Sequence, residues 1–289
     1  MLLLQLLVDG IQLGALYALM AVGFAIIFGS TRVFHYAHGT TYIIVGYLFY
    51  FGAERLHVPW WAAAAVAAVA GMLFGVLLDR WVYRVIQRDE GSFFTVFVAS
   101  FGAAVVVENV IIVLFGSSFV SITTPLSRGD QIFCIVISRL GIVSVFAAIV
   151  LFTLLNAFLT RTDVGVSLRA LSENPDLVRG FGLNPRRLSQ YAFAIGSLLV
   201  APAAIVATCV TGLSPSAGHR VVLISLAATI IGGIGSLRGA GLGGLLLGLA
   251  ESLAVWRLST GWSEAVAFVI LFCFILARPS GLFGTRARV

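Results

Sequence analysis

The segment MLLLQLLVDGIQLGALYALMAVGFAIIFG (residues 1–29) decides the fold class, because it is apolar over a length that crosses a lipid bilayer. About 20 apolar residues in a helix, at about 1.5 Å per residue, span a hydrocarbon core of ~30 Å. The segment has no basic residues ahead of its apolar run, carries Asp9, and continues far past the apolar core of a signal peptide. It therefore predicts a first membrane helix that the mature protein retains.

Similar apolar runs recur along the whole chain of 289 residues, which is 60% hydrophobic and 10% charged, with a mean hydropathy of +1.06. Backbone groups in lipid must be hydrogen-bonded internally, and continuous rather than alternating apolar runs indicate helices instead of a barrel. We expect spans at about 3–29, 40–54, 60–79, 93–115, 140–159, 190–211, 221–236, 239–256 and 263–277. The sequence thus predicts an all-α, polytopic membrane helix bundle of eight or nine spans or half-spans, forming a single transmembrane domain over residues 1–289.

Two of these segments are short for complete crossings, namely 40–54 and 221–236. A glycine break separates 221–236 from 239–256, so these two segments could be half-helices or a re-entrant pair. Residues 116–139 are less apolar and are predicted to form an external loop, in which IFCIVIS (132–138) is either a short interfacial strand or the start of the next helix.

The arginines predict the orientation, because short loops rich in basic residues stay in the cytoplasm. All 18 basic residues are arginine, and the formal net charge is +6. On one side lie Arg32, Arg80, Arg84, Arg88, the arginines between residues 161 and 187, Arg278, Arg286 and Arg288. We therefore expect the N-terminus outside and the C-terminus in the cytoplasm, and the positive charge indicates loop placement rather than nucleic-acid binding.

Small residues are concentrated in GGIGSLRGAGLGGLLLG (232–248). Gly235, Gly239 and Gly243 recur every fourth residue, and Gly244 pairs with Gly248 at the same spacing. In lipid, helices associate through such small faces because the backbones can approach closely. The segment predicts either a tight helix crossing within the chain or a mobile gate or subunit contact.

Glu108 and Asn109 lie inside the span 93–115, about seven residues from its outer end. A charged side chain at the centre of a bilayer costs about 2.5–3.5 kcal/mol on an insertion scale, and less at this depth. Glu108 should therefore face a partner or a wet cavity. Three roles stay open, which are pairing with a neighbour such as Arg139, lining a transport path, and relaying protons.

His35 and His38 stand three residues apart in RVFHYAHG (32–39), a spacing that serves a metal only with two further ligands. No cysteine or acid lies nearby, so we favour a polar break that ends at Gly39 and turns the chain back into the membrane. The cysteines are Cys134, Cys209 and Cys273, which are widely spaced in apolar surroundings and predict core packing instead of a disulfide or metal site.

The sequence contains no G-x-x-x-x-G-K motif and no lysine with which to build one. A nucleophile elbow, an H-E-x-x-H motif and a paired-carboxylate loop are likewise missing from it. The chain is therefore not expected to be an enzyme, and no catalytic residue is assigned.

One polar block interrupts the apolar pattern, RTDVGVSLRALSENPDLVRGFGLNPRR (161–187). Asp163 can cap a short helix through Leu171, and Asn174 can cap a second helix that has a proline at its first position and ends near Gly182. Two short amphipathic helices on the cytoplasmic side follow from this pattern. They could lie on lipid headgroups, or they could dock into a cytoplasmic partner that supplies energy.

The block resembles a known element of transport proteins. RALSENPDLVRGFGLNPRRL (169–188), followed by QYAFAIGSLLVAPAAIVA (190–207), is similar to the coupling loop and next helix of bacterial ABC importer permeases of the branched-chain amino acid (LivH) type. LGALYALMAVGFAIIFGSTRVFHYAHG (13–39), IIGGIGSLRGAGLGGLLLGLAESL (230–253) and SEAVAFVILFCFILARPSGLFG (263–284) resemble the first helix and its break, the glycine-rich segment and the closing helix of that family. The likeness covers nearly the whole chain.

The resemblance implies a permease of the bacterial cytoplasmic (inner) membrane that pairs with a second, homologous permease. Two cytoplasmic ATPases, which use ATP and Mg, and an external or periplasmic substrate-binding protein would complete the transporter, with lipid around it and no nucleic acid. This chain would bind no cofactor itself. Its coupling loop would be residues 161–189, and the residues in the ATPase groove would be Arg169, Ser172, Glu173, Asn174, Pro175, Asp176, Leu177, Arg179 and Gly182.

The resemblance also marks positions where this chain departs from the family. The family usually has Asn where His35 stands, an acid where Thr40 stands, and often Gln where Glu108 stands. The candidate substrate path comprises His35, His38, Gly39, Thr40, Glu108 and Asn109. If these residues line the route, the cargo is a branched-chain amino acid or a related small amide or carboxylate. The alternative is a secondary transporter or channel that uses Glu108 and the glycine-broken helices.

Overall fold

A computed structural model describes residues 2–88, 92–122, 124, 129–132, 135–258, 260–278 and 280–283. Cys134, Arg128, Arg286 and Arg288 lie outside these residues. The first half of the chain contains α1 (Leu2–Thr31), α2 (His38–Tyr50), the π-helix η1 (Phe51–Arg55), α3 (Trp60–Leu78), the π-helix η2 (Asp79–Tyr83), α4 (Arg84–Arg88) and α5 (Phe93–Phe115). The second half contains α6 (Arg139–Arg161), α7 (Asp163–Glu173), α8 (Pro175–Gly180), α9 (Pro185–Val210), α10 (Ala217–Gly232), α11 (Leu237–Ala254), the 3-10 helix η4 (Thr260–Trp262) and α12 (Ser263–Ala277).

The all-α membrane class predicted from the apolar runs is confirmed. Within the described residues, five helices are long and apolar enough to cross a bilayer, and α10 with α11 counts as a sixth if that bent pair is one span. α10 and α11 are bent by 118° at the glycine break that the sequence indicated. The membrane orientation of the two termini stays a prediction.

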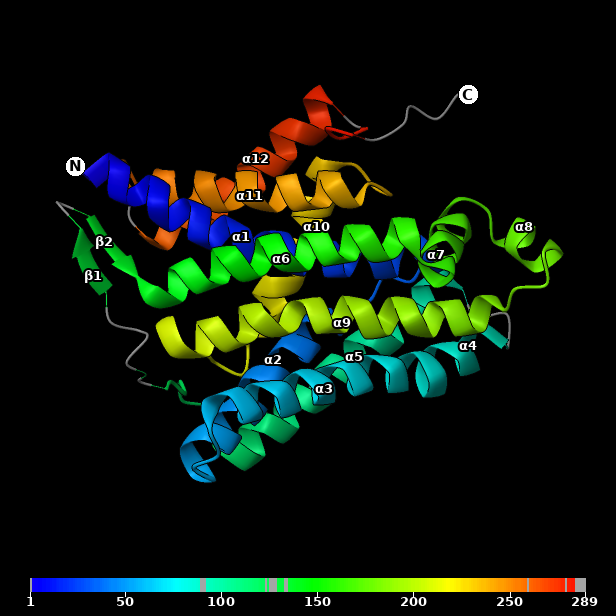
Figure 1. Cartoon of the computed structure of the whole chain (residues 1–289), viewed down its shortest axis with the longest axis horizontal. Coiled ribbons are helices and arrows are strands. Elements are labelled where there is room, and N and C mark those ends of the chain that lie inside the picture. The colour runs from blue at the N-terminus through cyan, green and yellow to red at the C-terminus, as the bar shows by residue number, and fades with distance from the viewer. Residues whose placement is uncertain are drawn as a thin grey trace. The chain divides into compact units, whose positions relative to one another are not determined.

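A short hairpin precedes α6 (Figure 1). Its strands are β1 (Gly129–Ile132) and β2 (Ile135–Ser138), which pair antiparallel with Gly129 opposite Ser138 and Ile132 opposite Ile135. Of the two alternatives for residues 132–138, the structure contains a strand at the described positions, 132 and 135–138.

By its internal contacts the chain divides into two compact units that are interleaved in sequence. The first unit comprises Met1–Ala25, Thr123–Val150 and Leu223–Val289, and the second comprises Ile26–Ile122 and Leu151–Val222. That the chain is a single permease domain remains a prediction.

In the second unit, α2, α3 and α9 pack against one another (Figure 1). The buried face of α3 presents small residues every fourth position, Ala63, Ala67, Gly71 and Gly75. A Cβ on Gly75 would overlap the Ser197 hydroxyl of α9, so glycine permits the close approach of these helices. The sequence interpretation overlooked this small-residue face because alanines, not glycines, form half of it.

In the first unit, the glycines of α11 contact two helices. A Cβ on Gly244 would lie 2.5–2.7 Å from backbone atoms of Tyr17 and Ala18 in α1, and Gly248 meets the backbone of Gly14 in the same helix. Gly243 lies against Ala228 of α10, and Gly239 lies against Gly232. Gly235 has a positive φ of 93° in the bend, where a side chain would meet nothing within 4 Å.

The end of α10 is completed by a segment distant in sequence. The backbone N–H groups of Leu282 and Phe283 donate to the carbonyls of Ile231 and Gly232, at 2.9 and 3.0 Å. Gly281 adopts a positive φ of 74° just before them. The last carbonyls of a helix have no intrahelical donor, and here residues 282 and 283 supply one to each of two carbonyls.

Candidate functional site

The break between α1 and α2 brings polar residues to the interior of the second unit. Residues 32–37 are not helical, and Arg32 has a positive φ of 56°, which a non-glycine residue seldom adopts. Gly39 opens the first turn of α2, where a Cβ would overlap the carbonyl oxygen of Gly218. The two glycines therefore let the N-terminal end of α10 approach the start of α2.

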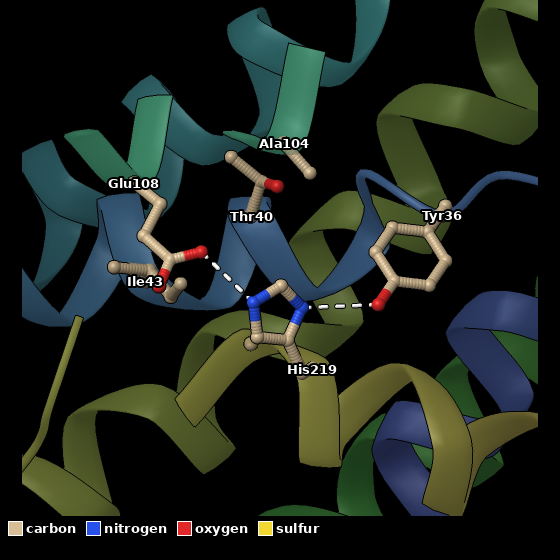
Figure 2. A pocket seen from close by; sticks show the side chains of 7 residues that line it. Tyr36, Thr40, Ile43, Ala104, Glu108 and His219 are labelled. Atoms are coloured by element: carbon tan, nitrogen blue, oxygen red, sulfur yellow. Dashed lines mark hydrogen bonds and ion pairs between the residues drawn. The ribbon is translucent and has the colours of Figure 1, made fainter. Parts of the chain in front are cut away.

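A small polar hollow lies at this approach (Figure 2). About 190 Å³ of its space is not filled by atoms, which includes space open to the surroundings, and its lining residues are Tyr36, Thr40, Ile43, Ala104, Glu108, Gly218 and His219. Figure 2 shows the side chains of Glu108 and Tyr36 pointing toward the two ring nitrogens of His219. Glu108 Oε2 lies 2.9 Å from His219 Nε2, and the Tyr36 hydroxyl lies 3.0 Å from His219 Nδ1.

This arrangement accommodates two protonation states of His219. In the neutral state with hydrogen on Nε2, the ring donates to Glu108 and accepts from the Tyr36 hydroxyl at Nδ1. In the charged state both ring nitrogens donate, and the tyrosine oxygen accepts. The His219 side chain is 40% exposed and that of Glu108 is 18% exposed, so neither group is fully buried.

Pairing with a neighbour was one of the three roles left open for Glu108, and the hollow contains such a neighbour. Its ion-pair partner in the structure is His219, whereas the sequence interpretation had suggested a neighbour such as Arg139. Thr40 lines the same hollow, so two of the three positions where the chain departs from the pattern of the similar permeases, Thr40 and Glu108, face one space. Gly39 lies against Gly218, which lines the hollow.

The other predicted path residues lie elsewhere. His35 is fully buried, and its Nδ1 is 2.8 Å from the Tyr83 hydroxyl. The His35 and His38 rings are 6.0 Å apart, and the described residues contain no cluster of three or more His, Cys, Asp or Glu that could hold a metal. Asn109 is exposed, and its amide donates to the carbonyl of Val105 one turn earlier in α5.

The predicted coupling loop, residues 161–189, contains two short helices, as the sequence indicated, with one correction. The side chain that caps α7 is Thr162, whose hydroxyl accepts from the N–H of Gly165 at 3.1 Å, rather than Asp163. Asp163 occupies the first turn instead, where its negative charge interacts favourably with the helix dipole. Thr162 precedes it directly and is extended, so it takes the capping position.

α8 begins and ends as the sequence indicated. Asn174 Oδ1 accepts from the N–H groups of Asp176 and Leu177 at 3.0 and 3.1 Å, and Pro175 is the first helical residue. Gly182 has a positive φ of 73° after the last turn. Val178 is buried, whereas Leu177 is 53% exposed and Phe181 is also exposed.

Most of the other predicted coupling residues are exposed as well. Arg169, Glu173, Asn174, Pro175, Asp176, Arg179 and Gly182 are exposed, and Ser172 is half-buried. Arg179 forms an exposed ion pair with Asp176 at 3.1 Å. α7 and α8 contact each other, and both contact α9. Figure 1 shows them beside the N-terminal end of α9.

Sequence reasoning missed several polar residues of the hollow and the interior, among them Tyr36, Asp79, His219 and Glu251. Tyr36 and His219 complete the hollow, and Glu251 of α11 is buried and accepts from the Tyr17 hydroxyl at 2.8 Å. Asp79 and Glu251 were visible in the sequence as acids near the ends of apolar runs. The importance of His219 depends on Gly39 and Gly218, whose approach no local pattern reveals.

Apolar helices with glycine-lined crossings, a break between α1 and α2 and a polar hollow are the features of a multi-pass membrane permease. The chain belongs to the family described as branched-chain amino acid transport system / permease component, whose model matches residues 6–275. It is thus a permease subunit of an ABC importer family found in bacterial membranes and is not itself the ATPase.

The relatives match at nearly full length. The chain is 29% identical to the high-affinity branched-chain amino acid transport system permease protein BraD of Pseudomonas aeruginosa, over 97% of this chain and 95% of that protein. It is 27% identical to the corresponding permease protein LivH of Escherichia coli K12, with the same coverage. A chain in the structure of PsaBC from Streptococcus pneumoniae in complex with Fab has a TM-score of 0.51 at 13% identity, over 98% of this chain and 92% of that chain, which supports the fold alone.

Proposed function

We propose that this chain forms part of the path for a branched-chain amino acid, or a related small amide or carboxylate, and couples to cytoplasmic ATPases through residues 161–189. The partners would be a second, homologous permease, two ATPase subunits that use ATP and Mg, and an external substrate-binding protein. ATP binding would close the ATPase pair and carry α8 with it, so that the membrane helices change from inward to outward access.

The observation that supports coupling most directly is the exposed apolar pair on a capped helix. Leu177 lies on α8 and Phe181 directly follows its last residue, four positions later, while Val178 is the buried side chain of the helix. A capped helix that presents apolar side chains is suited to a groove in a partner. Burying one leucine side chain contributes about 1.5–3 kcal/mol, so its loss should weaken ATPase binding about 10–100-fold.

The test is association and transport with purified subunits in proteoliposomes. Leu177→Asp should lose the ATPase in a pull-down and abolish ATP-dependent uptake. Val85→Asp is the matched control, since Val85 is 51% exposed on the neighbouring helix α4 and should leave association unchanged. Normal ATPase binding by Leu177→Asp would refute the coupling role.

The hollow supports a cargo that carries an ammonium or amide group. Glu108 offers a carboxylate acceptor, and His219 and Tyr36 offer groups that both donate and accept. A hydrogen bond to a charged group contributes about 1.5–3 kcal/mol, so Glu108→Gln should reduce uptake of a charged amine cargo about 10–100-fold.

Uptake of leucine, a short amide and a short carboxylate by the intact transporter separates the cargo classes. Asn109→Ala is the matched control, because the adjacent Asn109 bonds within its own helix and does not line the hollow. Equal uptake by Glu108→Gln and wild type for all three cargoes would show that the hollow does not contact the cargo.

The carboxylate–imidazole pair also favours one second candidate, a proton-coupled secondary transporter or a channel. That function requires uptake to collapse with a protonophore while ATP is held constant, and to depend on Glu108. Uptake that needs ATP and resists the protonophore excludes it.

A further inference from the structure

An ion pair between Asp79 and Arg84 lies just after the end of α3 and bonds to the start of α9. Asp79 is 3% exposed and opens the π-helix η2. Its carboxylate accepts from Arg84 Nε at 2.9 Å and Nη2 at 2.6 Å, and from the Ser189 hydroxyl at 2.7 Å. Three donors compensate for the loss of water around this carboxylate, which a buried charge requires.

The same arginine also holds the backbone of α9. Arg84 Nη2 donates to the carbonyl of Arg186, one residue after Pro185 begins the helix. Arg186 and Ser189 follow the exposed helix α8 directly, since only residues 181–184 separate α8 from α9. The Asp79–Arg84 pair therefore binds the start of α9, where the proposed coupling loop joins the helix bundle.

The other end of η2 holds the break between α1 and α2. Tyr83 is fully buried, and its hydroxyl bonds to His35 Nδ1 at 2.8 Å and to Ser100 Oγ at 2.9 Å. Ser100 in turn accepts from the N–H of Ala37 at 2.9 Å. Phe193 of α9 packs against both rings, 5.0 Å from His35 and 5.5 Å from Tyr83, measured between ring centroids.

One five-residue π turn thus contacts the start of α9 through Asp79 and the break through Tyr83. Tyr36, inside the same break, reaches His219 and so the hollow. If these contacts were only structural, apolar side chains would stabilise the fold equally well, because they often replace a buried ion pair without loss of stability. A bidentate arginine instead fixes direction and register, and π turns inside helices recur at functional sites.

We propose that Asp79, Arg84 and Ser189 are positioning residues that transmit a displacement of the α8–α9 junction to the break at residues 32–37, and from there to the hollow at His219 and Glu108. This inference rests on the proposed coupling function of residues 161–189. Under this proposal, the Asp79–Arg84 pair determines how much cargo is imported for each ATP hydrolysed. It does not determine the binding of the ATPase or of the cargo.

The experiment uses the complete transporter in proteoliposomes, with permeases, ATPases and loaded binding protein. Three quantities are measured, which are ATPase subunits retained, ATP hydrolysed, and cargo imported per ATP. Ser189→Ala removes one bond to Asp79 but keeps the ion pair, so it should fold. Asp79→Asn removes the charge. Arg80→Gln, an exposed arginine of the same π turn, is the matched control.

We expect Ser189→Ala to lower cargo imported per ATP about tenfold, the size of one hydrogen bond to a charged group. The maximal uptake rate should fall, while the binding-protein concentration for half-maximal uptake and the amount of bound ATPase should not change. Asp79→Asn should lower the ratio further, and the double variant should match Asp79→Asn alone because both changes act on one contact. Arg80→Gln should behave as wild type.

Two results overturn the proposal. One is that Ser189→Ala, and the fraction of Asp79→Asn that assembles, import as much cargo per ATP as the wild type. The other is loss of bound ATPase in proportion to lost import, which would make the pair a mere support for the docking surface. The proposed coupling function fails by a separate result, normal ATPase binding by Leu177→Asp, so the two failures are distinguishable.

Discussion

Replacing Gly244 with alanine should separate α11 from α1 and destabilise the chain. The added Cβ would lie 2.5–2.7 Å from backbone atoms of Tyr17 and Ala18. Carbon atoms in favourable contact are about 3.5–4.0 Å apart, so the helices must move by about 1 Å. Overpacking of this kind costs about 1–3 kcal/mol, and the better helix propensity of alanine offsets about 1 kcal/mol.

The matched control is Gly102→Ala in α5, where a Cβ would meet nothing within 4 Å. It gains the same propensity without the overlap, so the two variants should differ by about 1–3 kcal/mol in unfolding free energy. A change of 1 kcal/mol shifts Tm by about 2–4 °C at comparable chain lengths, which predicts a difference of roughly 2–12 °C.

Thermal unfolding of the detergent-purified protein measures this difference. Equal Tm values for Gly244→Ala and Gly102→Ala would refute the argument that backbone contact at Gly244 holds α11 to α1.

Three further changes test local features. Asn174→Ala should remove the cap of α8, at about 1 kcal/mol, and weaken ATPase binding about fivefold in a titration, whereas Asn174→Asp should not. Gly182→Val should impose strain of about 1–3 kcal/mol at its positive φ and reduce ATPase association while membrane insertion is unchanged, and normal association would contradict this. Tyr17→Phe should remove one hydrogen bond to buried Glu251 and lower the unfolding free energy by about 1–3 kcal/mol, and an unchanged Tm would argue against a role for that bond.

The sequence predicted helices and caps well because their signals are local. The spans 93–115 and 263–277 agree with the helices α5 and α12 at both ends, and Asn174 with Pro175 marks the start of α8. The assignment of the α7 cap was wrong because Thr162 and Asp163 are adjacent and both can cap a helix, and only the backbone angles decide between them.

The candidate site was harder to predict because its partners are distant in sequence. Ser189 bonds to Asp79 across 110 positions, and His219 reaches Glu108 over a similar separation. Periodicity within a helix assigns a face but not the helix that covers it. Glu108 could be recognised as an acid in need of a partner, whereas its partner followed only from the contact of Gly39 with Gly218.

The contact of residues 282 and 283 with the end of α10 bears on how sequence variants should be interpreted. Deletions in the stretch around Gly281, or substitutions that displace its backbone, would be expected to affect a loop after α12, yet they withdraw backbone donors from two carbonyls about 50 positions earlier. Such variants should lower the amount of folded permease in the membrane while each surviving molecule transports at its normal rate. A screen that scores only total uptake would mistake them for transport mutants.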